Sequence, residues 1–186
     1  MWFEVPERFR GEQRSVEAQI RDAFRGVTRE GGVSWSESVI VDGDGSGRTR
    51  EQARLEDTET AWEELVDDPS WQHEVGMGGF NFLDPIGYRY YIAPAMIRCI
   101  REGGGEVISY ALDVSGDFKR GLVSLINPNQ AHVIARFIRL MIAIHKAVGD
   151  EIFGASWIFA YKIHWREWDR GTPLPDAELD GEGESR

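Results

Sequence analysis

The sequence predicts an α-rich α+β domain in which five or six helices pack on a small antiparallel β-sheet. Apolar residues recur at helical spacing along most of the chain. An aromatic stretch over residues 79–92 is interrupted by Asp-Pro-Ile-Gly, which favours a tight turn between two strands. Residues 106–114 alternate apolar and polar side chains, as strands do. With 186 residues, 41% of them hydrophobic, we expect a single globular domain over residues 1–170.

The first third of the chain predicts three helices. One begins at about Ser15, because apolar residues follow at helical spacing and a Gly-Gly pair lies beyond its end. Ser34 and Glu37 have the spacing of a capping box, which predicts a short second helix. Residues 49–66 combine many charges with widely spaced apolar residues, which predicts a polar amphipathic helix, either continuous or split near Asp57-Thr58.

The middle of the chain predicts the sheet. In the expected hairpin over residues 79–92, Asp84 takes the first position of a type I turn, followed by proline. Pro94 then suits the first turn of a helix over about 94–102. The alternating residues 106–114 predict a third strand.

The last third predicts the centre of the fold and a tail. The helix expected over residues 128–148 is the most apolar in the chain, so it should be central. Another helix, rich in aromatic residues, is expected over about 150–168. Residues 171–186 hold five acidic residues and one arginine, with prolines and glycines, which predicts a disordered acidic tail.

Composition excludes several classes of function. The net charge of -11 repels phosphate backbones, so we expect no nucleic-acid binding. The longest apolar stretch is interrupted by Arg139 and is too short to cross a bilayer, and the first residues lack a signal peptide, so a cytoplasmic location without membrane association is expected. The single cysteine, Cys99, lies among apolar residues, which is typical of a core position. The charge favours a basic partner.

Among metal-binding motifs, the sequence matches part of an EF-hand calcium-binding loop. Asp42, Asp44, Ser46 and Gly47 match positions 1, 3, 5 and 6 of an EF-hand loop. Position 12, where a glutamate closes the ion site, is Ala53, so an ordinary turn is the better interpretation. The four histidines lack the spacing of a metal motif. We therefore expect no metal and no cofactor.

The candidate site lies on the expected hairpin. There Arg89 and Tyr91 share one face, Tyr88 lies on the other, and Asp84 lies at the turn. Tyrosine and arginine dominate binding hot spots, so these four residues are the candidate ligand- or partner-binding set. The structural alternative is that Asp84 caps the turn, Arg89 pairs with an acid and the tyrosines pack.

Residues 62–68, 80–98 and 126–141 resemble a family of uncharacterised bacterial proteins known only as a domain of unknown function. Members commonly read Phe-Leu-Asp-x-x-Gly-Tyr/Phe-Arg-Tyr-Tyr-Leu-Pro-Ala, and here the proline stands one place later. The resemblance covers about residues 15–168. It implies a single cytoplasmic bacterial domain and brings no activity and no catalytic residue with it.

Two functions remain open from the sequence. The first is an acidic protein-binding module, resembling immunity proteins or inhibitors, with a protein partner that is basic. The alternative is an enzyme or small-ligand-binding domain with its site on the 79–92 hairpin. The absence of a catalytic constellation favours the binding module, and no catalytic residue is assigned.

Overall fold

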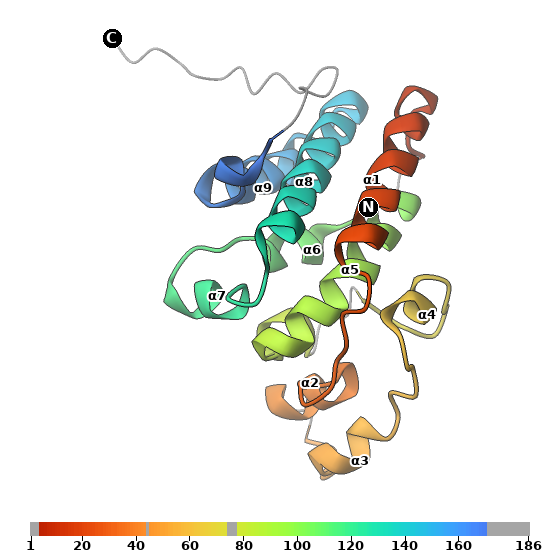
Figure 1. Cartoon of the computed structure of the whole chain (residues 1–186), viewed down its shortest axis with the longest axis vertical. Coiled ribbons are helices and arrows are strands. Elements are labelled where there is room, and N and C mark those ends of the chain that lie inside the picture. Colours follow the sequence, from red (N-terminus) through yellow and green to blue (C-terminus); the bar gives the residue numbers. More distant parts are fainter. Residues whose placement is uncertain (1–3, 44, 74–77, 171–186) are drawn as a thin grey trace.

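The computed structural model describes residues 4–43, 45–73 and 78–170. In these ranges the chain is helical and contains no strand, so the α+β prediction is wrong (Figure 1). The α-helices are α1 (Arg10–Ala23), α2 (Trp35–Asp42), α3 (Arg50–Arg54), α4 (Trp62–Val66), α5 (Pro85–Glu102), α6 (Glu106–Ala111), α7 (Asp117–Leu122), α8 (Pro128–Val148) and α9 (Glu151–Ile163). The 3₁₀ turns are η1 (Glu7–Phe9), η2 (Gly79–Phe82) and η3 (Trp165–Trp168).

The expected hairpin is a 3₁₀ turn followed by the start of α5. Asp84 is the N-cap of this helix, and its carboxylate accepts a hydrogen bond from the Gly87 backbone N–H at 2.8 Å. Pro85 occupies the first helical position, where its missing N–H costs no helical hydrogen bond. An Asp-Pro pair suits a helix start as well as a turn, so this local signal could not separate the two. The helix continues through Pro94, which was expected to begin a separate helix.

The expected third strand is α6, with the residues that follow it. Ile108 and Leu112 are four residues apart and both have 0% of their surface exposed. Tyr110, which strand alternation would place on the same face, is 53% exposed. The apolar residues therefore follow the helical period, and their alternation is incidental.

Helix α8 lies at the centre of the core. It begins after the N-cap Asn127, whose side chain accepts hydrogen bonds from two backbone N–H groups of the first turn. Most of its 21 residues are buried, and α1, α9 and η3 pack around it. The apolar pattern of residues 128–148 predicted both the bounds of this helix and its central place.

The remaining helices divide between the two ends of the molecule. Figure 1 shows α2 and α3 at one end, α1, α8 and α9 at the other, and α5 between them. The helix expected over residues 49–66 is split into α3 and α4, and the segment between them is not helical. None of the helices in the described ranges has the length and apolar character needed to cross a bilayer. The predicted acidic tail, residues 171–186, lies outside the described residues.

Candidate functional site

Three of the four predicted site residues hold the fold together at separate places. Asp84 accepts a second hydrogen bond from the Val33 backbone N–H at 3.0 Å, which ties the loop before α2 to the start of α5. The buried hydroxyl of Tyr88 donates to the carbonyl oxygen of Ala111 at 2.8 Å. Arg89 is half-buried, and its Nη1 lies 3.4 Å from the carbonyl oxygen of Leu125. These side chains therefore contact separate parts of the fold and are not grouped on a hairpin.

The fourth predicted residue, Tyr91, joins α5 to a buried polar network. Its hydroxyl accepts a hydrogen bond from the Trp35 backbone N–H at 2.9 Å and donates to Oε1 of Glu59 at 2.9 Å. The ring is fully buried, and burial raises the pKa of its hydroxyl. Tyr91 therefore acts as a neutral hydrogen-bonding group and is not an activated nucleophile.

Arg29 forms the cationic centre of this network. Its Nε lies 3.3 Å from Oε1 of Glu59, and its Nη1 lies 3.7 Å from Oδ2 of Asp57. The Asp57 carboxylate also accepts hydrogen bonds from the backbone N–H and the hydroxyl of Ser36, at 2.9 and 2.8 Å. The network thus fixes the segment between α3 and α4 against the start of α2. Burial raises the pKa of Glu59, and the charge of Arg29 opposes that rise.

The segment held by this network forms one wall of a cleft of about 400 Å³, here called the acidic cleft. Five carboxylates line it and, among the described residues, no basic side chain does. Two tryptophans, Trp35 and Trp71, lie against each other edge to face in it, with ring centroids 5.2 Å apart. The carboxylates are those of Glu56, Asp57, Glu59, Glu64 and Asp68.

The acidic cleft carries net negative charge even after its ion pairs are counted. Asp57 and Glu59 share Arg29, and Glu56 lies 2.7 Å from Nη1 of Arg48. Arg29 and Arg48 thus pair with three of the five carboxylates. Arg98 also lies beside the cleft, where it donates to the carbonyl oxygens of Asp68 and Trp71, but its charge is paired with Glu102, so the balance stays negative when all five are ionised. The pKa values of the two other carboxyl groups are lowered, mainly by hydrogen bonds from the Thr60 hydroxyl to Glu64 and from the Ser70 hydroxyl to Asp68.

This arrangement suits a positively charged group. Carboxylates attract and hydrogen-bond an ammonium or guanidinium group. The two tryptophans are buried, and the Arg98 guanidinium already lies over the Trp71 ring, 5.9 Å from its centroid, so the carboxylates supply the attraction. Two serine hydroxyls in the cleft donate to carboxylates, Ser36 to Asp57 at 2.8 Å and Ser70 to Asp68 at 2.7 Å, and these contacts hold the lining segments in place.

Most of the cleft has no signal in the sequence. Trp35 lies in the predicted short helix, Asp57 in the predicted polar helix and Trp71 in a segment without a predicted helix. The one local signal was the acidic run at residues 56–59, which marks a negatively charged edge without showing what it faces. Only the packing of α5 against these segments brings them together.

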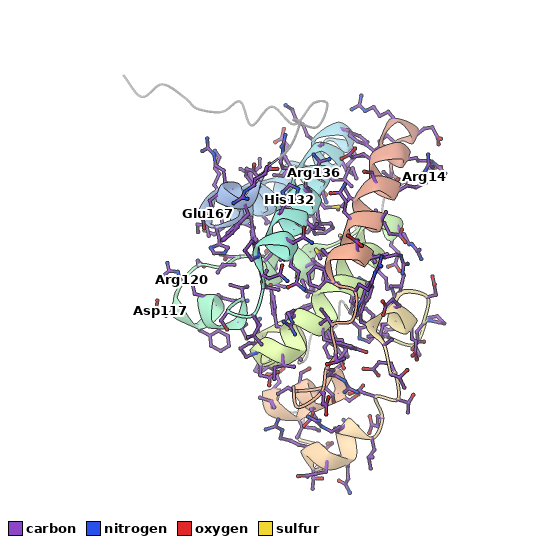
Figure 2. The ribbon with its side chains drawn as sticks, viewed as in Figure 1. Arg14, Asp117, Arg120, His132, Arg136 and Glu167 are labelled. Atoms are coloured by element: carbon purple, nitrogen blue, oxygen red, sulfur yellow. The ribbon has the colours of Figure 1, made fainter. Side chains whose placement is uncertain are left out.

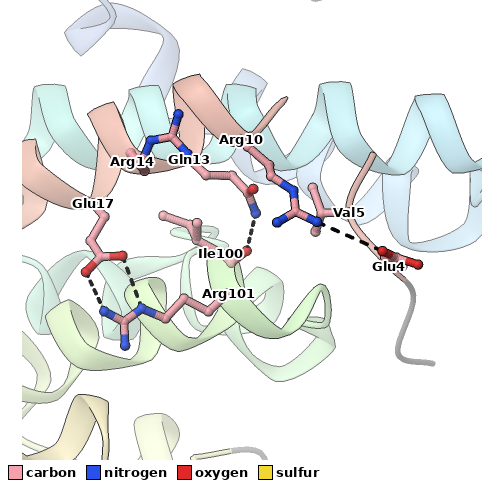
Figure 3. Close-up of a pocket in the computed structure, with 8 residues that line it drawn as sticks. All are labelled: Glu4, Val5, Arg10, Gln13, Arg14, Glu17, Ile100 and Arg101. Carbon is pink, nitrogen blue, oxygen red and sulfur yellow. Dashed lines mark hydrogen bonds and ion pairs between the residues drawn. The ribbon is translucent and has the colours of Figure 1, made fainter. Parts of the chain in front are cut away.

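A second pocket of about 340 Å³ lies between α1 and the end of α5 (Figure 3). Its polar groups already pair across it: Nη2 of Arg101 is 2.7 Å from Oε1 of Glu17, and Gln13 donates to the carbonyl oxygen of Ile100 at 2.6 Å. Arg10 lies 4.0 Å from Glu4 at its mouth. Because four of its five charged side chains pair with one another, this pocket is a weaker candidate than the acidic cleft.

In the EF-hand-like segment, the described side chains make the hydrogen bonds to backbone N–H groups that are typical of a turn. Asp42 ends α2, and its carboxylate accepts a hydrogen bond from the Gly78 backbone N–H at 2.8 Å. The Ser46 hydroxyl accepts one from the Arg48 backbone N–H at 3.2 Å, and Asp44 lies outside the described residues. Within the described ranges, no three His, Cys, Asp or Glu side chains gather as metal ligands would.

Cys99 and three of the histidines also have structural surroundings. Cys99 is buried, with its Sγ 3.0 Å from the carbonyl oxygen of Gly104. His132 on α8, labelled in Figure 2, accepts a hydrogen bond from the Arg170 backbone N–H at 3.2 Å. His145 lies 3.2 Å from the Asp150 carboxylate. His73 is buried and stacks on the cleft residue Trp71, with ring centroids 5.4 Å apart.

Taken together, these features define an all-helical domain with an acidic, tryptophan-lined cleft. The chain belongs to the family described as "Family of unknown function (DUF6714)", whose model matches residues 12–151. The matched region contains α2 to α8 and every residue of the acidic cleft. No curated protein and no solved structure matches the chain.

Proposed function

We propose that this protein is a binding module of the immunity or inhibitor type, and that its acidic cleft receives lysine or arginine side chains of a basic partner protein. The observation that carries the proposal is the placement of five carboxylates around Trp35 and Trp71. The net charge of -11 would speed the approach of such a partner by long-range attraction. The proposal includes the cytoplasmic, bacterial setting implied by the sequence.

A small organic cation is the second candidate for the same cleft. A volume of about 400 Å³ falls in the range of pockets that hold small ligands. Of the four residues predicted from the sequence, Tyr91 contributes to this site by holding Glu59 and the start of α2 in place. That Asp84, Tyr88 and Arg89 contact a ligand or partner remains a prediction.

Isothermal titration with defined probes tests the proposal. The probes are an arginine-rich hexapeptide, a glutamate-rich hexapeptide and free arginine amide, each at about 50 and about 500 mM salt. We expect the arginine-rich peptide to bind, the acidic peptide not to bind, and high salt to weaken binding. Free arginine amide that binds as tightly as the peptide would favour the small-cation alternative.

Two matched double variants locate the binding site. Glu56→Gln/Glu64→Gln removes two charges from the exposed rim of the cleft. The control, Glu4→Gln/Glu7→Gln, removes two exposed charges near the N-terminus, outside the cleft lining. We expect the first variant to weaken peptide binding roughly 5- to 30-fold and the control to change it little. Equal losses in both variants would mean that only net charge matters, and the cleft would be rejected as the site.

A further inference from the structure

Helix α9 has an apolar face that no other described element covers. Its buried side, which includes Trp157 and Tyr161, packs on α8, α6 and η3. On the opposite side Ile152 is 79% exposed, Phe159 is 51% exposed and Ile163 is 42% exposed. These three residues are seven and four positions apart, so they form one stripe along the helix. They account for three of the nine large hydrophobic side chains that are exposed in the described residues.

One flank of this stripe carries two opposite charges, one at each end. Glu151 lies in the first turn of α9 and Lys162 in the last turn, and both are exposed. Successive residues turn by about 100°, which places these two side chains within about 20° of each other around the axis, beside the stripe. The described residues offer neither of them an ion-pair partner.

A second copy of α9, running antiparallel, would satisfy these features together. In a two-fold antiparallel pair, residues on one flank meet the same flank of the partner helix, so Glu151 of each copy would face Lys162 of the other. The midpoint of that pairing lies between residues 156 and 157. The large ring of Phe159 of one copy would then lie over the small side chain of Ala155 of the other. The midpoint of this second pairing is residue 157.

The charge pairing and the size pairing therefore need nearly the same register. Their midpoints differ by half a residue, which shifts one helix along the other by one residue, or about 1.5 Å. A parallel pair would instead set this flank against the opposite flank of the partner helix, so Glu151 and Lys162 would not meet. The pattern of charges thus selects the antiparallel arrangement.

We propose that the exposed face of α9 is a homodimer interface in which two copies of this chain pair their α9 helices antiparallel about Ser156 and Trp157. The contact is short, because α9 has 13 residues, so it falls below the size of a standard stable interface. The dimer is accordingly weak, with a dissociation constant on the order of 10 to 100 µM. It leaves the acidic cleft free, because α2, α3 and α4, whose segments form the cleft, lie away from α9 (Figure 1).

Sedimentation equilibrium of the full chain tests the proposal, at protein concentrations from about 1 to about 500 µM and about 0.15 M salt. The mass should rise with concentration from 21.1 kDa toward twice that value. Phe159→Glu should weaken dimerisation at least about tenfold, because it places a charge in the apolar stripe. Thermal melting of each variant checks that the fold is retained.

A charge swap tests the direction of pairing. Lys162→Glu should weaken the dimer by placing two glutamates opposite each other, and Glu151→Lys/Lys162→Glu should restore it. The control is Arg14→Glu, which changes the net charge by the same amount on an exposed residue of α1, and it should leave the dimer unchanged. A wild-type chain that stays monomeric at every concentration would overturn the proposal. So would a dimer that Phe159→Glu leaves intact, or one that the swap fails to restore.

Discussion

Replacing Tyr91 with phenylalanine removes a single oxygen atom from the middle of the polar network beside the acidic cleft. The hydroxyl makes two hydrogen bonds at 2.9 Å, accepting from the Trp35 backbone N–H and donating to Glu59. The ring itself, which has 0% of its surface exposed, keeps its packing in the variant. The substitution therefore isolates the hydrogen bonds from the hydrophobic contribution of the side chain.

The expected cost follows from what is left behind. The Trp35 backbone N–H loses its partner in a buried position, which costs about 1–3 kcal/mol. Glu59 loses a donor to its carboxylate but keeps Arg29 at 3.3 Å, so we assign about 1 kcal/mol to that loss. The sum is about 3 kcal/mol, which corresponds to a fall in Tm of roughly 6–12 °C for a chain of this size.

Two other tyrosines provide matched controls. Tyr88→Phe removes one hydrogen bond, from a buried hydroxyl to the carbonyl oxygen of Ala111, and should cost about 1 kcal/mol. Tyr110→Phe changes a side chain that is 53% exposed and should cost less than about 0.5 kcal/mol. Urea unfolding followed by tryptophan fluorescence measures all three variants. If Tyr91→Phe were no more destabilising than Tyr110→Phe, the argument that this hydroxyl supports the cleft would be refuted.

Two further predictions concern burial and close packing. Burial, with the charge of Arg98, lowers the pKa of His73 from 6.5 to about 4. The unfolded state then binds more protons between these values, so stability should fall by up to about 3 kcal/mol as the pH drops from 6.5 to 4, and His73→Gln should flatten that part of a stability–pH curve. Gly87→Ala should destabilise the fold by about 3 kcal/mol or more in urea unfolding, because the added methyl group would meet the Val33 carbonyl oxygen. The control is Gly121→Ala on α7, where the methyl group would lie in open space and the effect should be neutral or stabilising. Equal effects of the two substitutions would contradict the packing argument.

Several elements could be predicted from the sequence because their signals are local. The capping box of Ser34 and Glu37 opens α2, one residue after the serine. The Asn-Pro pair before residue 129 opens α8, and the apolar stripe that follows sets its length. In each case the side chain that ends or starts the helix bonds to a backbone group within four residues.

The error over residues 79–92 has an equally specific cause. Asp84 and Pro85 satisfy the rules of a type I turn and those of a helix N-terminus, and the following aromatic residues suit either a strand or a buried helix. The choice between strand and helix depends on contacts with residues that are distant in the sequence. The Asp84 carboxylate also binds the Val33 backbone N–H, and the helical spacing of Tyr88, Tyr91 and Ile92 lets all three be buried together.

By itself the sequence determined the negative charge, the positions of several helix starts and the identity of the most apolar, central helix. Each of these depends on composition or on neighbours within one or two turns. The choice of helix for residues 85–102 and the assembly of the acidic cleft were decided only by the tertiary structure. The cleft depends on Arg29, Glu59 and Tyr91 meeting from separate segments, and such long-range contacts leave no periodic trace along the chain because each segment satisfies its own local pattern without them.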